Sequence, residues 1–203
     1  HVLPITTTYS LTLSILKNCD CIIAETSLEK DCLVSYYGVP ESLVTVIPNA
    51  IEDYSLDSDV QLYKRSRDIN NEFILVVGRF DPNKNQLSII RALKDSEIPV
   101  VFIGGPSAGS EDYYQQCIAE ASQSMIFEGW MDRSDPLYRS AYSSAKVVAL
   151  ASFREIFGNA VLEGAMAGAN VVTTNAIPVY EWGLRGLVEE IEPTDVSSIK
   201  KGL

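Results

Sequence analysis

Two pairs of charged residues have the types and the spacing that chemistry needs. Arg79 and Lys84 stand five positions apart in "VVGRFDPNKNQ", directly after an apolar run that ends at Gly78. An arginine fork and a lysine point charge together suit a diphosphate. Glu155 and Glu163 stand eight positions apart around a Phe-Gly-Asn turn. A buried carboxylate needs hydrogen-bond donors, and a pair of ribose hydroxyls would satisfy Glu163. Taken alone, each pair is more typical of solvated surface charge.

A strand, a loop and a helix must position the two glutamates. "KVVALAS" is interpreted as the strand, "FREIFG" as the loop, and residues 158–167 as the helix. The first N–H groups of this helix suit a phosphate, and they would point to the sheet edge where the Arg79 loop lies. The helix is expected to pack closely against its neighbours because it is rich in small residues, which are Gly164, Ala165, Ala167 and Gly168.

Apolar runs alternate with helical patterns along the chain, which predicts an α/β fold with a doubly wound, Rossmann-like parallel sheet. The main series has six short apolar runs, which are "FILVVGR", "IPVVFIGGP", "SMIFEGW", "AKVVALAS", "ANVVTTN" and "GLVEEIEP". A shorter, partial α/β series at the N-terminus holds only "CDCIIAET" and "LVTVIPNAI". The helix between these two runs is expected to be capped by Ser27 and to end at Gly38.

The unequal series predict three parts of the chain. Residues 1–50 hold too few elements for an independent core, so we interpret them as the end of a domain that begins before this chain. Residues 51–71 are polar and lack a clean period, which is typical of a connector. Residues 72–203 are predicted to form the ligand-binding domain, truncated in a last helix that starts after Thr194 or Asp195.

The composition excludes several classes of partner and site. The chain has 203 residues, 46% of them hydrophobic and 21% charged, which is typical of a globular protein. A net charge of −11 argues against nucleic acid as a partner. No apolar run is long enough for a transmembrane segment, and a cytoplasmic location is expected.

"GGPSAG" fits neither the P-loop nor the dinucleotide spacing and is interpreted as a plain turn. No metal or cofactor is predicted, because the cysteines lack metal-site spacing: Cys19, Cys21, Cys32 and Cys117.

Four motifs in a fixed order resemble one family. They are the Glu-x7-Glu element "EIFGNAVLE" followed by "GAMAGANVV", the loop "VGRFDPNKN", the segment "FEGWM", and "CDCIIAETSLEKDCLVSYYGVPESLVTVIPNAI". Together they resemble the retaining GT-B glycosyltransferases of family 4, also called glycosyl transferases group 1, over nearly the whole chain. Residues 1–50 are similar to the segment that closes the N-terminal, acceptor-side half of that fold. Residues 72–203 are similar to its C-terminal, nucleotide-sugar-binding half.

The resemblance implies a role for each site residue. Arg79 and Lys84, in the loop that Gly78 begins, would hold the diphosphate of the donor. Glu155 would bind hydroxyls of the transferred sugar and is the candidate catalytic residue, whereas Glu163 would bind the ribose. Backbone groups would contact the sugar and phosphates at Phe157, Gly158 and Asn159, and the nucleobase at Met131. Asn85 departs from the family, which frequently has glycine after this lysine.

The implied reaction moves a hexose from a nucleotide-diphosphate sugar to a hydroxyl of a sugar, lipid-linked or protein acceptor, with retention of anomeric configuration. UDP, GDP and ADP remain open as carriers. Family members need no metal or cofactor and work in the cytoplasm or at the cytoplasmic face of the membrane. Their acceptor site and a functional histidine lie in the N-terminal half, and His1 is assigned no role. The chain alone is therefore expected to bind donor, to be inactive, and to self-associate through an apolar face at residues 21–24.

Two other functions fit the same architecture. A sugar-nucleotide epimerase would need extra acid and base residues in the cleft and no acceptor. A non-catalytic partner subunit would have lost part of the donor-binding set, whereas this chain retains all of it, namely Arg79, Lys84, Glu155 and Glu163.

Overall fold

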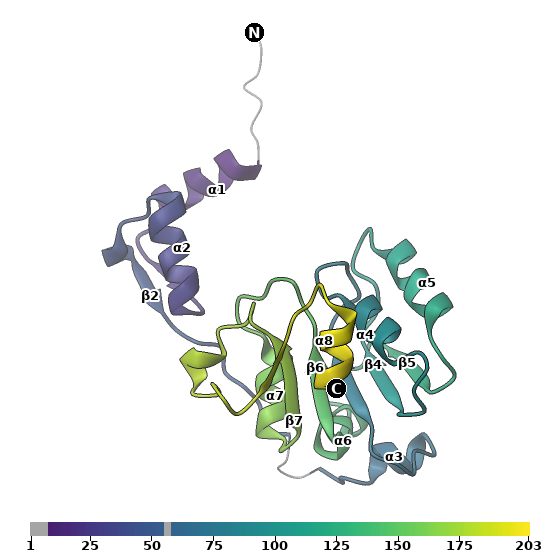
Figure 1. Cartoon of the computed structure of the whole chain (residues 1–203). Helices are drawn as coiled ribbons and strands as arrows, with labels where there is room; N and C mark the ends of the chain where they lie inside the picture. The colour runs from purple at the N-terminus through teal and green to yellow at the C-terminus, as the bar shows by residue number, and fades with distance from the viewer. Residues whose placement is uncertain (1–7, 55–57) are drawn as a thin grey trace. The chain divides into compact units, whose positions relative to one another are not determined.

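The computed structural model describes residues 8–54 and 58–203 of the chain (Figure 1). The chain divides into two compact units, His1–Ala50 and Ile51–Leu203. Each unit is described by itself.

The first unit is a small α/β segment with two parallel strands. Its elements are α1 (Thr8–Lys17), β1 (Ile22–Ala24), α2 (Ser27–Tyr37), the 3-10 helix η1 (Glu41–Leu43) and β2 (Val44–Val46). Its buried core is small and consists of Ala24, Val39 and Val44. The cap of α2 differs from the prediction, because Thr26 and not Ser27 accepts the Glu29 amide (3.1 Å). The helix ends at Gly38 in the left-handed region, as predicted (φ 65°).

The second unit contains the predicted parallel sheet of six strands. Its strands are β3 (Ile74–Val77), β4 (Val100–Ile103), β5 (Met125–Gly129), β6 (Val147–Leu150), β7 (Asn170–Thr174) and β8 (Glu189–Ile191). They lie side by side in the order β5-β4-β3-β6-β7-β8, and every pair is parallel. After β3 the chain adds β4 and then β5 on one side of it, whereas β6, β7 and β8 follow on the other side. The topological switch point therefore lies between β3 and β6. Ligands of open α/β sheets bind at such a point, beyond the carboxyl ends of the strands.

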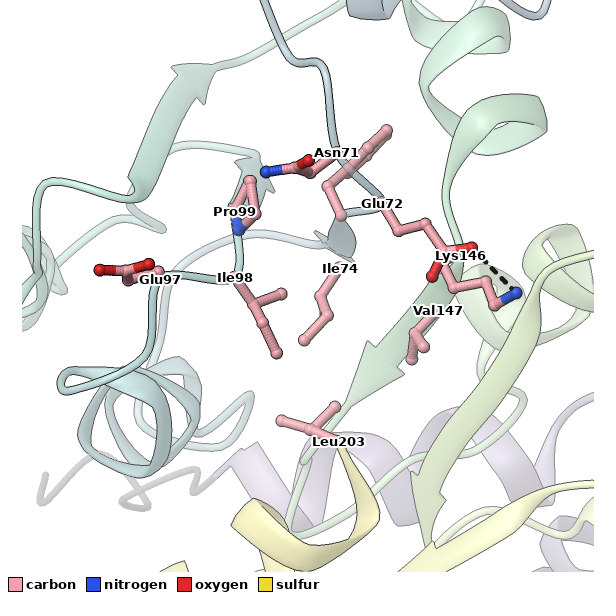
Figure 2. A pocket seen from close by; sticks show the side chains of 10 residues that line it. Asn71, Glu72, Ile74, Glu97, Ile98, Pro99, Lys146, Val147 and Leu203 are labelled. Carbon is pink, nitrogen blue, oxygen red and sulfur yellow. Dashed lines mark ion pairs between the residues drawn. The ribbon is translucent and has the colours of Figure 1, made fainter.

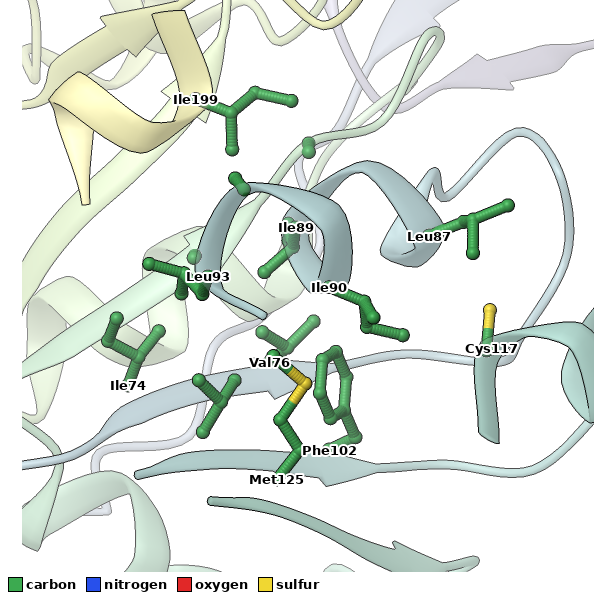
Figure 3. Close-up of a cluster of buried hydrophobic side chains, with 14 of the residues drawn as sticks. Ile74, Val76, Leu87, Ile89, Ile90, Leu93, Phe102, Cys117, Met125 and Ile199 are labelled. Carbon is green, nitrogen blue, oxygen red and sulfur yellow. The ribbon is translucent and has the colours of Figure 1, made fainter. Parts of the chain in front are cut away.

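Helices cover both faces of the sheet because the buried side chains of each strand alternate between them. Val148 packs with α3 (Leu62–Ser66) and α6 (Pro136–Ser144), whereas its neighbour Ala149 packs with α4 (Gln86–Leu93) and α8 (Val196–Gly202). Figure 3 shows the second of these clusters between α4, α8 and the strands. The remaining elements are α5 (Glu111–Glu120), α7 (Asn159–Met166) and the 3-10 helix η2 (Val179–Trp182). The N-cap of α8 is Asp195, which accepts the Ser197 amide (2.8 Å).

The segment that we interpreted as a connector packs into the second unit. Among its described residues, Tyr54 and Tyr63 are fully buried in the core that α6 also lines. The Tyr63 hydroxyl donates to Glu128 (2.6 Å), and Arg67 pairs with the same carboxylate. This packing could not be predicted from the polar sequence, because its few large apolar side chains follow neither a helical nor a strand period.

Candidate functional site

The loop after β3 is folded around Asp81. One carboxylate oxygen of Asp81 accepts the amides of Asn83 (2.9 Å) and Lys84 (3.2 Å), and the other accepts Nε of Arg79 (2.8 Å). The Arg79 side chain is nevertheless 61% exposed. Because a guanidinium has five N–H donors, the contact with Asp81 orients Arg79 and leaves it able to donate to a ligand. Sequence reasoning missed Asp81, although the Asp-Pro-Asn run is a typical turn signal.

Asn85 ends this loop in a conformation that favours glycine. Its φ is 56°, in the left-handed region, and the residue is buried. Its side-chain amide donates to the backbone carbonyls of Ala151 (3.1 Å) and Pro193 (2.8 Å). Asn85 therefore supplies a backbone geometry that glycine would also allow, and its side chain joins three loops at the carboxyl edge of the sheet.

Lys84 and Glu155 meet at the switch point. Nζ of Lys84 forms an ion pair with Oε1 of Glu155, and their side chains are 18% and 12% exposed. The hydroxyl of Ser152 donates to the same oxygen (2.7 Å). The surrounding backbone is also tied, because the Phe153 amide donates to the Asn83 carbonyl (2.8 Å). The loops after β3 and β6 thus form one polar surface, in which Lys84 keeps two further N–H donors.

The helix α7 starts at the same edge of the sheet. Its N-cap, Gly158, has a φ of 79°, and a Cβ there would lie 3.1 Å from the Ile177 side chain. Phe157 is buried against Trp182, with ring centroids 5.0 Å apart, so it meets a ligand only through its backbone. Asn159 is the first helical residue. The first-turn N–H groups of a helix lack intrahelical partners and carry partial positive charge, which suits an anion.

Glu163 is buried on α7, as expected, but protein groups supply its hydrogen-bond donors. The residue is 2% exposed. Its Oε2 accepts from the hydroxyl of Tyr142 on α6 (2.7 Å), and its Oε1 pairs with Nη2 of Arg133. Burial, together with Tyr138 and Glu163, raises the pKa of Tyr142 well above its ordinary value, so the phenol remains a donor. Sequence reasoning missed both partners because they are 30 and 21 residues from Glu163.

Arg133 has the opposite exposure, since its side chain is 57% exposed. Partial burial is the largest single effect and lowers the pKa of this guanidinium, but Glu163, Tyr138 and Tyr54 together outweigh it and leave the pKa raised. Arg133 is therefore a charged, outward-facing side chain fixed on a buried carboxylate.

The glycine-rich stretch after β4 is more than the plain turn that the sequence suggested. A Cβ at Gly104 would lie 2.1 Å from the Gly78 carbonyl oxygen, and one at Gly105 would lie 2.3 Å from Nε1 of Trp130. The Gly105 carbonyl accepts the Phe80 amide (2.7 Å). These glycines permit the close approach of neighbouring loops. Met131 follows Trp130 and is partly buried against the core beside α6.

A pocket of about 530 Å³ lies at the opposite edge of the sheet, where β3 and β6 begin (Figure 2). Its apolar lining includes Ile74, Val147 and Leu203, and the exposed pair Lys146 and Glu72 (3.1 Å) lies at its side. None of the predicted donor-site residues lines this pocket.

The predicted site residues thus form two described clusters at the carboxyl edge. One joins Lys84 to Glu155 with Arg79 in the same loop, and the other joins Glu163 to Arg133 and Tyr142. Within residues 8–54 and 58–203, no group of three His, Cys, Asp or Glu side chains is arranged to hold a metal ion. The same residues include no helix that is long and apolar enough to cross a membrane.

A family model described as "Glycosyl transferases group 1" matches residues 59–182, which include both clusters. The chain belongs to this family. Two of its curated relatives are D-inositol 3-phosphate glycosyltransferases. The Corynebacterium kroppenstedtii protein is 27% identical over 93% of this chain and 46% of its own length, and the Kineococcus radiotolerans protein is 28% identical over 75% and 39%. The chain therefore spans about half the length, or less, of these members of the family.

Solved structures share the fold of this glycosyl transferases group 1 chain. Anabaena HepE in complex with UDP and glucose matches with a TM-score of 0.81 at 18% identity, over 95% of this chain and 55% of HepE. The sucrose-phosphate synthase of Thermosynechococcus elongatus matches with a TM-score of 0.75 at 21% identity, over 96% and 50%. The six-stranded sheet with its helices is thus the Rossmann-like half of a GT-B fold.

Proposed function

We propose that this chain is the donor-binding part of a retaining family 4 glycosyltransferase. The enzyme moves a hexose from a nucleotide-diphosphate sugar to a hydroxyl acceptor and keeps the anomeric configuration. Membership in the family supports transfer, and the curated relatives named above are glycosyltransferases. HepE is a structural neighbour that was solved with UDP-glucose.

One observation carries the proposal, which is the Lys84–Glu155 pair at the switch point. It places a cation and a carboxylate from adjacent strands where a doubly wound sheet binds its ligand. Lys84 and the exposed Arg79 hold the donor diphosphate and neutralise it as it leaves, so the reaction proceeds without a bound metal. The amides around Gly158 contribute partial positive charge to the same anion.

Two carboxylates contact the sugars of the donor. Glu155, steadied by Lys84 and Ser152, binds hydroxyls of the transferred hexose and is the candidate catalytic residue. Glu163 accepts from the ribose through lone pairs that Tyr142 and Arg133 leave unused. Backbone groups at Met131 contact the nucleobase.

Neither alternative function gains support from the site. An epimerase needs further acid and base groups beside the sugar, and the two carboxylates described in these loops, Glu155 and Asp81, are already paired with Lys84 and Arg79. A non-catalytic subunit is expected to lose donor-binding residues, whereas all four are present and the loops that hold them are ordered by hydrogen bonds.

Calorimetric titration with UDP, GDP and ADP tests the proposal. At least one should bind, and Arg79→Ala or Lys84→Met should weaken that binding by about 1.5 to 3 kcal/mol, the range for hydrogen bonds to charged groups. Arg91→Ala is the matched control, because Arg91 is an exposed arginine paired with Glu120 on another surface. Equal affinity of the wild type and both site variants would remove the diphosphate assignment.

A further inference from the structure

We propose that Arg133 contacts the nucleoside part of the donor, and that Glu163 and Tyr142 position it for this contact. The inference rests on the proposed function, because it names a further binding residue of the same site. The ligand atoms are hydrogen-bond acceptors of the nucleoside, such as the carbonyl oxygens of a base, and not the phosphates.

The exposure of the ion pair points to Arg133 as the ligand-facing member. The Arg133 side chain is 57% exposed, the Glu163 side chain 3%, and Tyr142 is fully buried. A ligand that arrives from solvent therefore meets the guanidinium first. The contact with Glu163 uses Nη2, and a guanidinium carries five N–H donors in a planar fork.

The pair is built more rigidly than an ordinary surface salt bridge. Its carboxylate accepts from Tyr142, which belongs to a cluster of three tyrosine rings that pack against one another. The ring centroids are 5.6 Å apart for Tyr54 and Tyr138, 5.2 Å for Tyr54 and Tyr142, and 5.4 Å for Tyr138 and Tyr142. Burial is the main reason that the pKa of both Tyr138 and Tyr142 is raised, and the nearby Glu163 carboxylate raises both further. Burying the Glu163 carboxylate costs desolvation energy that the ion pair can fail to recover, so stabilisation of the fold does not by itself account for the pair.

The backbone that carries Arg133 is fixed as well. The pairing of β5 with β4 shifts by one residue after Phe127, so that Gly129 and not Glu128 lies opposite Ile103. Bulges of this kind re-aim the chain that follows and are common beside active sites. Asp132 then accepts the Ser134 amide (2.8 Å), which closes a turn with Arg133 in its middle.

The contact with Glu163 places the Arg133 guanidinium beside the predicted ribose ligand, although its loop is separate from the loop of the diphosphate cations. The diphosphate cations follow β3, whereas Arg133 follows β5, two strands away. Neighbouring strands are about 4.8 Å apart, so the two loops start about 10 Å apart along the carboxyl edge. A nucleoside diphosphate extends beyond its phosphates, and Arg133 pairs with Glu163, the predicted ribose ligand, which favours the nucleoside as its partner.

Titrations with UDP, GDP, ADP and inorganic pyrophosphate test the inference. Arg133→Met should lower the affinity of the nucleoside diphosphate that binds wild type about tenfold or more, the effect of losing a charge-assisted hydrogen bond. It should change pyrophosphate affinity less than twofold. Arg79→Ala should lower both. Arg133→Lys should not restore nucleotide affinity, because lysine lacks the planar fork.

Two controls separate contact from folding. Arg91→Met should leave both affinities unchanged, because Arg91 pairs with Glu120 on an exposed surface. The double variant Arg133→Met/Glu163→Gln is a control for folding alone, because Glu163 is itself the proposed ribose ligand: it removes the buried charge together with its partner, so it should melt closer to wild type than Arg133→Met does. An equal loss for pyrophosphate and nucleotide, or no loss for either, would overturn the role of Arg133. Failure of the wild type to bind any of the three nucleotides would instead overturn the proposed function.

Discussion

At the scale of single residues, Asn85 holds together the loops at the carboxyl edge of the sheet. It adopts a left-handed backbone conformation, and its side chain bridges the loops that follow β3 and β6 to the chain near Pro193. Glycine would allow the same φ without the bridge. A residue such as alanine would lose the bridge and also pay the conformational cost.

Asn85→Gly and Asn85→Ala separate these two contributions. Asn85→Gly leaves two backbone carbonyls without their donor and should lower the free energy of unfolding by about 1 to 3 kcal/mol. Asn85→Ala should lower it by about 1 to 2 kcal/mol more, because alanine is strained at positive φ. Urea unfolding measures both. Asn85→Ala as stable as Asn85→Gly would show that the left-handed conformation is not retained.

At the scale of secondary-structure elements, the small residues of helix α7 determine how closely it packs on the sheet. Gly164 faces β6, and a Cβ added there would lie 2.6 Å from Cβ of Val148. The helix therefore approaches the sheet more closely than a larger side chain permits, and it carries Glu163 into the buried cluster.

Gly164→Ala should lower the free energy of unfolding by about 1 to 3 kcal/mol through overpacking against Val148. The double variant Gly164→Ala/Val148→Ala should recover part of the loss relative to the sum of the single variants, because truncation of Val148 makes room. A double-mutant cycle from urea denaturation measures this coupling. Strict additivity would mean that α7 moves away from β6 instead.

The pair of Arg67 and Glu128 joins the segment of α3 to β5. The hydrogen bond from Arg67 lowers the pKa of Glu128 below its ordinary value of 4.5, against the opposing effect of burial. A carboxylate with a lowered folded pKa stabilises the fold above its unfolded pKa, and that stabilisation is lost as pH falls through the folded value. The contribution is thus full near pH 7 and declines below about pH 4.5.

Glu128→Gln should lower the free energy of unfolding at pH 7 by about 1.5 to 3 kcal/mol, the range for hydrogen bonds to charged groups. The difference from wild type should shrink as pH falls below about 4.5, where Glu128 takes up a proton in the unfolded chain first. Urea denaturation at pH 7, 5 and 3 measures it. Glu72→Gln, in an exposed pair with Lys146, is the control with little effect at any pH. A Glu128→Gln difference that is constant with pH would contradict the linkage.

At the scale of the whole molecule, the proposed donor site belongs to one unit. The residues assigned to it lie between Gly78 and Glu163, within Ile51–Leu203. Transfer has a further requirement, because the acceptor hydroxyl must be held near the anomeric carbon and away from water. The chain spans about half the length of the curated relatives that it matches.

We therefore expect donor binding without transfer from the 203-residue chain. A nucleotide sugar should bind in calorimetry, and product release with sugar or lipid-linked acceptors should stay at the background measured with Lys84→Met. Gel filtration should show self-association that Ile23→Ser reduces, since Ile23 is 62% exposed on β1. Transfer well above that background would place the acceptor site within this chain.

The order of strands and helices along the chain was predictable, because each element depends on a local pattern of apolar residues. The six runs became β3 to β8, and the motif order identified the family that the comparison shows. Local chemistry also located the end of α2 at Gly38. The packing of Tyr54 and Tyr63 was not predictable, because nothing in the polar segment around them has a period.

The sequence by itself determined which residues carry charge beside the ends of strands, and hence Arg79, Lys84, Glu155 and Glu163 as candidates. Only the tertiary structure decided their partners, since an ion pair such as Lys84 with Glu155 forms across 71 residues and depends on strand order. The tertiary structure likewise decided that Glu163 contacts Arg133 and Tyr142, because no sequence spacing predicts these contacts. Hydrophobic periodicity is written locally along the chain, whereas the satisfaction of a buried charge depends on which distant side chains the fold brings to it.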